Sequence, residues 1–222
     1  MTQLEAIQAR HSVRQFLDKP LPPAVQAELE QEIDLCNEES GLHIQLVTQE
    51  PKAFQGFLAR YGKFSGVSNY LCMIGPKSRS FEELCGWYGE RLVLKAQSLG
   101  LNTCWVGLTY SKVEGVYTVL PGEKLALVIA LGYGTRQGVP HRSKNAEDVM
   151  DAVEPIPAWF MSGVQAALLA PTAMNQQKFR FILNPDNSVT AKAGSGAYAK
   201  VDLGIAKYHF QVGTGKEHVV WK

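Results

Sequence analysis

Residues suited to binding an anion stand near the N-terminus, where Arg10, Ser12 and Arg14 occupy alternate positions. In an extended chain, residues two apart point to the same side and lie roughly 6.6 Å apart. Two guanidinium groups and a hydroxyl on one side would suit a phosphate, because an arginine binds its oxygens in pairs. The alternative is that both arginines form surface ion pairs, which contribute little to stability. The spacing alone leaves both interpretations open.

Two further groups of basic residues could contribute to such a site. Arg142 and Lys144 repeat the two-residue spacing downstream of an apolar segment, and they could close the same anion site or stand in a solvated loop. Lys63 is a single cation in a loop with aromatic and glycine neighbours. A lysine in such a loop ordinarily faces solvent.

The segment 170–177, with the sequence APTAMNQQ, is the most unusual stretch of the chain. Pro171 stops a helix, small residues let the backbone approach a ligand, and two amides can bind the edge of a heterocycle. The amides are those of Asn175 and Gln177. The segment is typical of a ring-binding loop or of an ordinary helix-ending turn. Gly107, at the end of a predicted strand, can present its backbone N–H at close range.

Alternating helices and strands must position these residues. Apolar spacing predicts helices over 4–9, 24–36, 81–99, 158–169 and 201–210, and strands over 42–48, 70–74, 102–106, 125–131, 179–183 and 189–193. Ser80 and Glu83 predict a capping box before the third helix, and Gly100 ends that helix. This order favours a sheet covered by helices over a bundle or a sandwich.

Composition excludes several classes of function. With 22 basic and 21 acidic residues among 222, the net charge of +1 provides no field for nucleic acid. The four cysteines contain no Cys-x-x-Cys pair and the five histidines show no metal spacing, so we expect neither a disulfide framework nor a metal site. No apolar run approaches the roughly 20 residues of a membrane span, and the N-terminus does not resemble a signal peptide. We therefore expect a cytoplasmic protein.

Three segments together resemble the FMN-dependent nitroreductase family. Residues 10–16, RHSVRQF, are similar to its opening Arg-Arg-Ser-Val-Arg-x-Phe. Residues 100–107, GLNTCWVG, are similar to its Gly-Leu-Gly-Thr-Cys-Trp-x-Gly, and residues 170–179 resemble its Ala-Pro-Ser-Ala-x-Asn-x-Gln-Pro-Trp. The resemblance is strongest to the TM nitroreductase-like branch. It implies an α+β fold in which helices pack around a mainly antiparallel sheet.

The same resemblance implies a role for each motif. The Arg/Ser/Arg segment and a basic pair would hold the phosphate and ribityl chain of FMN, a lysine would lie at the pyrimidine edge, and backbone N–H groups would contact flavin N5 and O4. No catalytic side chain and no metal are implied, because the flavin carries the chemistry. The cofactor-binding residues would be Arg10, His11, Ser12, Arg14, Lys63, Gly107, Leu108, Arg142, Lys144, Pro171, Thr172, Ala173 and Asn175.

The order of the motifs departs from the usual family. The place where the Ala-Pro-Ser-Ala motif normally stands, residues 35–44, has lost the proline and the flavin-facing amide, and the motif follows residue 170 instead. Residues 202–209 resemble the family's central helix a second time. The chain is therefore expected to contain a nearly complete half, residues 1–150, and a truncated second half, residues 151–222. Together they would form one monomeric pseudo-dimer with a single flavin site.

The activity implied is that of an FMN-dependent oxidoreductase. It would take electrons from NAD(P)H and pass them through flavin N5 to a nitroaromatic, a quinone or a similar small aromatic acceptor, with no nucleic acid or membrane partner. One alternative is a non-catalytic homologue that binds flavin or another phosphate-bearing ligand. A second is a flavin-destroying or dehalogenating relative on the same scaffold. The sequence does not separate NADH from NADPH.

Overall fold

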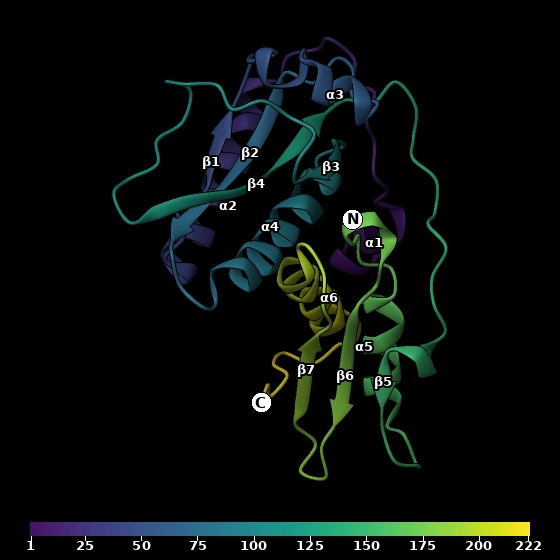
Figure 1. The fold of residues 1–222 in the computed structure, drawn as a ribbon. Helices are drawn as coiled ribbons and strands as arrows, with labels where there is room; N and C mark the ends of the chain where they lie inside the picture. The colour runs from purple at the N-terminus through teal and green to yellow at the C-terminus, as the bar shows by residue number, and fades with distance from the viewer. The chain divides into compact units, whose positions relative to one another are not determined.

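Apolar residues in the middle of the chain form a four-stranded antiparallel sheet with the strand order β1-β2-β4-β3 (Figure 1). Its strands are β1 (Gln45–Val47), β2 (Asn69–Pro76), β3 (Asn102–Val106) and β4 (Glu123–Gly132). A second sheet has three strands in sequence order, namely β5 (Met150–Asp151), β6 (Phe179–Leu183) and β7 (Val189–Ala193). β5 pairs with β6 in parallel and β6 with β7 antiparallel. The expectation of a mainly antiparallel α+β fold is confirmed, with the strands divided between two sheets.

The computed structural model describes residues 1–222, which form two compact units. The central unit comprises Ala9–Phe81 and Arg91–Pro140, and the terminal unit comprises Met1–Gln8, Glu82–Glu90 and His141–Lys222. The helices are α1 (Gln3–Ala9), α2 (Pro23–Ser40), α3 (Phe57–Tyr61), α4 (Phe81–Ser98), α5 (Ala158–Ala167) and α6 (Ala199–Gly213), with 3-10 turns η1 (Lys52–Phe54), η2 (Ala146–Asp148) and η3 (Ala173–Asn175). Helix α4 contributes residues to both units. These units differ in their boundaries from the predicted halves 1–150 and 151–222, and the half-repeats stay a prediction.

Most of the elements expected from the sequence are present. The strands predicted over 102–106, 179–183 and 189–193 have those bounds, whereas the strand predicted over 42–48 shortens to β1. The capping box at Ser80 is wrong. Ser80 has φ −87° and ψ −11°, helical values that prevent the extended geometry of an N-cap, and its hydroxyl lies 3.3 Å from that of Ser78 instead.

Both faces of the four-stranded sheet are buried. On one face, Tyr70, Cys72 and Ile74 of β2 belong to a cluster with Phe54 and Phe64. The intervening residues of β2 are buried as well, as expected for a strand covered on both sides. Beside the sheet, α2 and α4 are joined by Arg91, which donates to Glu32 at 2.5 Å and to Glu39 at 2.8 Å. No helix of the structure combines the length and apolarity needed to cross a bilayer.

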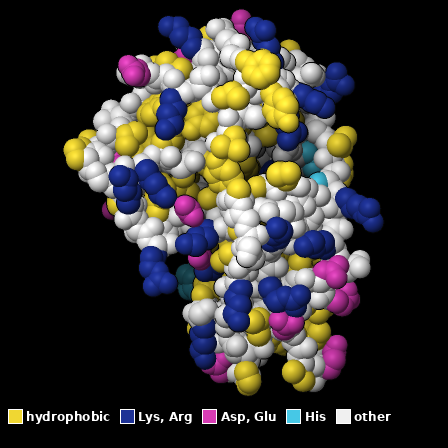
Figure 2. Space-filling view, in the orientation of Figure 1, with side chains coloured by type: hydrophobic (Ala, Val, Ile, Leu, Met, Phe, Trp, Pro, Cys, Tyr) yellow, Lys and Arg dark blue, Asp and Glu magenta, His cyan; other side chains and the backbone are white.

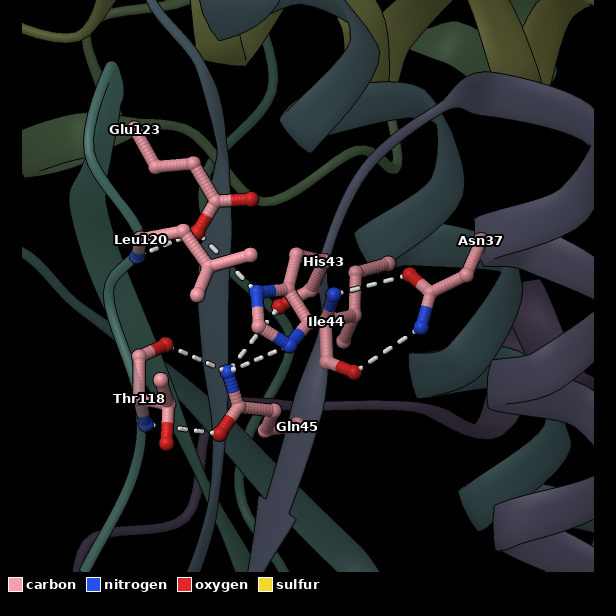
Figure 3. Close-up of polar contacts among 7 residues, drawn as sticks. All are labelled: Asn37, His43, Ile44, Gln45, Thr118, Leu120 and Glu123. Atoms are coloured by element: carbon pink, nitrogen blue, oxygen red, sulfur yellow. Dashed lines mark hydrogen bonds and ion pairs between the residues drawn. The ribbon is translucent and has the colours of Figure 1, made fainter.

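The segment that follows β3 is fastened to β1 by the side chain of Gln45 (Figure 3). Its amide Nε2 donates to Thr118 O at 2.7 Å, and its Oε1 accepts the Thr118 N–H at 2.9 Å. This pairing fixes the orientation of the amide, so Nε2 is also the group that faces His43 Nε2 at 3.2 Å. His43 Nδ1 lies 3.0 Å from a carboxylate oxygen of Glu123. The geometry therefore corresponds to a neutral His43 that carries its proton on Nδ1.

Helices α4 and α6 approach each other through a pair of glycines in the terminal unit. A Cβ on Gly86 would lie 2.0 Å from Val201 O, and a Cβ on Gly204 would lie 2.0 Å from Glu83 O. Each glycine thus meets the backbone of the residue three positions before the other. Reciprocal contacts of this kind occur where two surfaces are related by a two-fold axis. Only glycine permits this backbone approach.

The same helices enclose a buried histidine. His209 on α6 is fully buried, with Nε2 2.8 Å from Glu90 Oε1 on α4 and Nδ1 3.1 Å from Ala166 O on α5. Both ring nitrogens therefore have partners, as buried polar atoms require.

Substituting Gly86 or Gly204 by alanine tests the close approach. Alanine would stabilise an ordinary helix position by about 1 kcal/mol relative to glycine. Here we expect each variant to lose about 1–3 kcal/mol of unfolding free energy, because the new methyl group meets backbone atoms. Urea denaturation measures the change. In the control Gly56→Ala, the methyl would meet only the Ser111 hydroxyl oxygen at 3.1 Å, so a smaller loss is expected. Stabilisation by Gly86→Ala would contradict the described packing.

Candidate functional site

A cavity of about 330 Å³ in the central unit brings together much of the sequence-predicted anion site. Its size lies at the lower end of the range of about 300–1,000 Å³ typical of small-molecule sites. The lining residues are Ser12, Val13, Arg14, Gln15, Lys63, Arg136, Gln137, Gly138 and Val139. Three cationic side chains therefore line one concave surface.

The segment 10–16 is extended, as predicted, and runs along this cavity. It makes no long ladder but a series of single bridges, because its partners come from different segments. Val13 N donates to Thr103 O at 3.0 Å, and Phe16 N donates to Ser65 O at 2.9 Å. The predicted alternation is only partly present, since four consecutive residues, Ser12–Gln15, line the cavity. An irregular strand crossing the cavity wall explains this, because single bridges do not impose a regular pleat.

The opposite wall depends on a close backbone approach at Gly138. A Cβ there would lie 2.6 Å from His11 Cβ and 2.9 Å from Ser12 O. The absence of a side chain therefore lets the segment after β4 lie directly against the N-terminal segment. Asn102 supports the same loop, because its Nδ2 donates to Gln137 Oε1 at 2.8 Å and its Oδ1 accepts the Gly134 N–H at 3.0 Å.

Arg10 carries the one buried side-chain atom without a hydrogen-bond partner. The residue is only 5% exposed, yet its Nη1 donates to nothing. Arg10, Arg14 and Ser12 also act on the Cys104 thiol: burial raises its pKa, and the charges of Arg14 and Arg10 and a hydrogen bond with Ser12 oppose that rise. The predicted Arg/Ser/Arg group is therefore gathered around one point. A buried guanidinium N–H that has no partner within the protein can donate a hydrogen bond to an anion.

Arg136 is a cation that sequence reasoning missed. It lines the cavity with Arg14 and Lys63, whereas the sequence pattern directed attention to the later pair Arg142 and Lys144. Those two residues belong to the terminal unit and are exposed. The available signal was the position of Arg136 shortly after the end of β4, beside the strand that Ser12 bridges.

Lys63 adopts an unusual backbone conformation. It follows α3 with φ 61°, in the left-handed region where a helix commonly ends on glycine, and its N–H donates to Arg60 O at 2.9 Å. A non-glycine residue there costs on the order of 1–2 kcal/mol. Left-handed strain of this kind is frequent at functional sites. It is therefore consistent with a role for the lysine side chain.

The terminal unit brings together a second group of predicted residues. Asn175 Nδ2 donates to Arg142 O at 2.9 Å, and Lys144 Nζ donates to Gln177 O at 2.9 Å. The buried Gln177 amide completes the group, because its Nε2 donates to Arg142 O and its Oε1 accepts the Lys144 N–H, both at 2.9 Å. Arg142 and Lys144 are thus placed with the segment 170–177. The predicted site residues fall into two groups, one in each unit.

The segment after α5 is strained. Met174 and Asn175 have φ 53° and Gln177 has φ 45°, so three non-glycine residues within four positions are left-handed. Pro171 is buried, while Thr172 accepts the Gln177 N–H through its hydroxyl at 3.1 Å. Such strain costs about 1–3 kcal/mol per residue and persists only where the surroundings hold it. The segment is more than the ordinary helix-ending turn that the sequence left open.

The remaining predicted residues lie in the central unit. Gly107 and Leu108 follow β3 directly, as the sequence predicted for a strand end. The Leu108 side chain is 73% exposed. His11 is half-buried, with its Cβ facing Gly138. Lys and Arg side chains are spread over the face drawn in Figure 2 and form no single basic region there.

Solved structures define the class of fold. A putative nitroreductase from Thermotoga maritima has a TM-score of 0.64 at 22% identity, covering 96% of this chain and 83% of its own. A putative nitroreductase from Desulfovibrio desulfuricans in complex with FMN has a TM-score of 0.53 at 19% identity, covering 71% and 99%. A putative NADH dehydrogenase/NAD(P)H nitroreductase from Parabacteroides distasonis has a TM-score of 0.51 at 20% identity, covering 66% and 95%. The fold is therefore nitroreductase-like.

Sequence similarity gives the family within that class. The family described as "Putative TM nitroreductase" matches residues 2–214, which is nearly the whole chain. The chain belongs to this family, which confirms the resemblance found in its motifs and places the protein among oxidoreductases. No protein with curated annotation is significantly similar to it.

Lys63→Gly tests whether Lys63 is kept at the expense of stability. We expect the variant to gain about 0.5–1 kcal/mol of unfolding free energy, because glycine adopts the left-handed conformation without the steric cost, while it loses more entropy on folding. Urea denaturation measures the gain. Arg60→Gly, within α3, is the matched control and should lose about 1 kcal/mol. A loss of stability in Lys63→Gly would show that its backbone is not strained.

Proposed function

We propose that this protein is an FMN-dependent oxidoreductase that uses NAD(P)H to reduce a nitroaromatic, a quinone or a similar small aromatic acceptor. The observation that carries the proposal is the unpaired, buried Nη1 of Arg10 beside a cavity lined by Ser12, Arg14 and Lys63. The proposal is supported by family membership and by the similarity of fold to a protein solved with FMN.

The residues of the cavity fit the polar half of FMN. Arg14 and Arg136, which line the cavity, would offer guanidinium groups for the phosphate oxygens, and Ser12 would add a hydroxyl donor. The buried Arg10, two residues before Ser12, would add its unpaired Nη1. Arginine suits this role because its planar fork binds two oxygens at once. Gly138 brings two stretches of backbone together at the cavity, so that part of the cavity wall is backbone. A phosphate bound there would therefore cost little side-chain freedom.

The chain's own groups would tune and orient the bound cofactor. FMN, when bound, would supply the chemistry by accepting hydride at N5 from NAD(P)H and passing electrons to the acceptor. Lys63 would place a cation at the pyrimidine edge and so stabilise negative charge there. Gly107 and Leu108 would present backbone N–H groups at the strand end. No side chain of the chain need act as an acid or a base.

We infer further that the chain is an internal pseudo-dimer. The reciprocal contacts of Gly86 and Gly204 support this inference, because a two-fold axis between related helices produces such pairs. Residues of the central unit would bind the phosphate, and Pro171, Thr172, Ala173 and Asn175 would be further cofactor-binding residues. Residues 1–150 and 151–222 would be the two unequal repeats, and the protein would need no second copy to complete its flavin site.

Titration of the flavin-free chain with FMN tests the site. Arg10→Ala and Arg14→Ala should each weaken FMN binding by roughly 1.5–3 kcal/mol if they contact the phosphate. The matched control is Arg60→Ala, whose exposed side chain does not line the cavity and should leave the affinity unchanged. Isothermal calorimetry gives both affinity and stoichiometry. Unchanged affinity in both arginine variants would refute the phosphate assignment, and two equivalent FMN molecules per chain would refute the pseudo-dimer.

Turnover separates the oxidoreductase from a non-catalytic flavin-binding homologue. Anaerobic addition of NADH or NADPH to the FMN-loaded protein should bleach the oxidised flavin, and a nitroaromatic or a quinone should restore its colour. The rate with each nucleotide identifies the electron donor. A flavin that stays oxidised with both nucleotides would favour the binding protein.

A further inference from the structure

Asp202 is a buried carboxylate on α6 that contacts the strained segment after α5. The residue is 3% exposed. Its Oδ1 accepts the Ala173 N–H at 2.9 Å, and its Oδ2 accepts a hydrogen bond from Gln176 Nε2 at 2.8 Å. Both donors belong to the segment that contains the three left-handed residues. One side chain thus holds the segment at two points.

Other hydrogen bonds also hold the segment, among them that of the Gln177 N–H to the Thr172 hydroxyl and that of Asn175 Nδ2 to Arg142 O. Met174 is fully exposed, so its side chain contributes no packing that would offset the left-handed backbone. On one side, the Gln177 amide joins the segment to Arg142 and Lys144. On the other side, hydrogen bonds to Asp202 connect Ala173 and Gln176 to α6. Strained backbone requires such support.

The orientation of the Gln176 amide requires an ionised Asp202. Gln176 Nε2 donates both to Asp202 Oδ2 and to Ala197 O, the latter at 3.0 Å. Because a carbonyl oxygen can only accept, the amide nitrogen is fixed on this side and cannot turn to accept a proton from a carboxylic acid. Protonation of Asp202 would therefore weaken at least one of these two hydrogen bonds, because the hydroxyl oxygen of the acid is a poorer acceptor than a carboxylate oxygen.

We propose that ionised Asp202 is a positioning residue that holds Thr172, Ala173 and Asn175 in the conformation that would bind flavin. The proposal rests on the proposed function for its ligand, but the holding of the segment can be measured without flavin. Asp202 would not touch the cofactor itself. It would act through the Ala173 backbone and through Gln176.

The protonation of Asp202 should make both the local order of the segment and the global stability depend on pH. Burial raises its pKa to about 6, against the opposing hydrogen bonds from Ala173 and Gln176. Because this pKa lies above the ordinary 3.8, the contribution of Asp202 to global stability falls as the pH rises from about 4 to 6. In the folded chain, the carboxylate and with it the hold on the segment appear around pH 6. Local order and global stability should therefore change in opposite directions.

Other charged groups on the packed elements have their own partners. Lys207 of α6 donates to Glu83 of α4 at 2.6 Å, and Lys178 donates to Ser195 O at 2.9 Å. The burial of Asp202, rather than a neighbouring charge, is the main cause of its raised pKa. The titration near pH 6 should therefore follow Asp202 and disappear when that residue is replaced.

Amide hydrogen exchange of the full chain without flavin tests the hold. After correction for intrinsic exchange, Ala173 should be protected above about pH 7 and exchange about tenfold or more faster below pH 5. Asp202→Asn keeps an acceptor for Ala173 but faces Gln176 with a second donor, so protection should be intermediate. Asp202→Ala should lose it and show no pH dependence. Asp151→Asn, an exposed aspartate on β5, is the matched control and should behave as the unmodified chain.

The second measurement is FMN affinity at pH 7.5. Asp202→Asn should weaken FMN about tenfold while its global stability, measured in urea, stays at or above that of the unmodified chain, because a buried charge is removed. A purely structural role would instead lower both together. Ala173 protection or FMN affinity unchanged in both Asp202 variants would overturn the inference. If the unmodified chain binds no FMN, the proposed function fails, and the exchange measurement alone decides whether Asp202 holds the segment.

Discussion

The backbone contact between α4 and α6 is the constraint on which the functional parts of the terminal unit depend. Gly86 and Gly204 bring the two helices to the distance of bare backbones, where any larger side chain would collide with a carbonyl oxygen. This contact fixes the position of α6, and α6 carries both His209 and Asp202. His209 ties α6 to α4 and α5, and Asp202 reaches the segment after α5. A defect at the helix contact would therefore be transmitted to that segment.

The central unit holds its group of cations by a different principle. Three stretches far apart in sequence form single bridges with the N-terminal segment, and glycine at position 138 lets one of them lie against it. The guanidinium of Arg10 is buried within this arrangement without a partner for Nη1. The net charge of +1 therefore conceals a local concentration of positive charge.

Much of the fold followed from local patterns. The strands over 102–106, 179–183 and 189–193 were predictable because each is a short apolar run between clear turn residues. The capping box failed because the motif states which side chain is available, not whether the backbone of Ser80 is extended. The division into two sheets and the sharing of α4 arise from long-range contacts, which no local pattern contains.

The candidate site was predictable to a similar degree. The motifs located Ser12, Arg14 and Lys63, which line one cavity. They did not locate Arg136, because its place in the cavity depends on how the segment after β4 returns to the N-terminal segment. They also assigned Arg142 and Lys144 without showing that Gln177 binds their backbones. Tertiary contacts of this kind decide which basic residues of a chain meet.

Because Met174, Asn175 and Gln177 have left-handed backbones, the sequence motif of residues 170–179 does not by itself determine the shape of this loop. The energy that this conformation stores is offset by a carboxylate on α6 and by hydrogen bonds to the stretch around residue 143. An isolated peptide with the same sequence would adopt another conformation, because it would lack both of these hydrogen-bond partners. A chain that carries the motif but lacks an acidic residue at the matching turn of the helix would be expected to display a different loop. Recognition of such a loop across distant relatives therefore needs the helix as well as the motif.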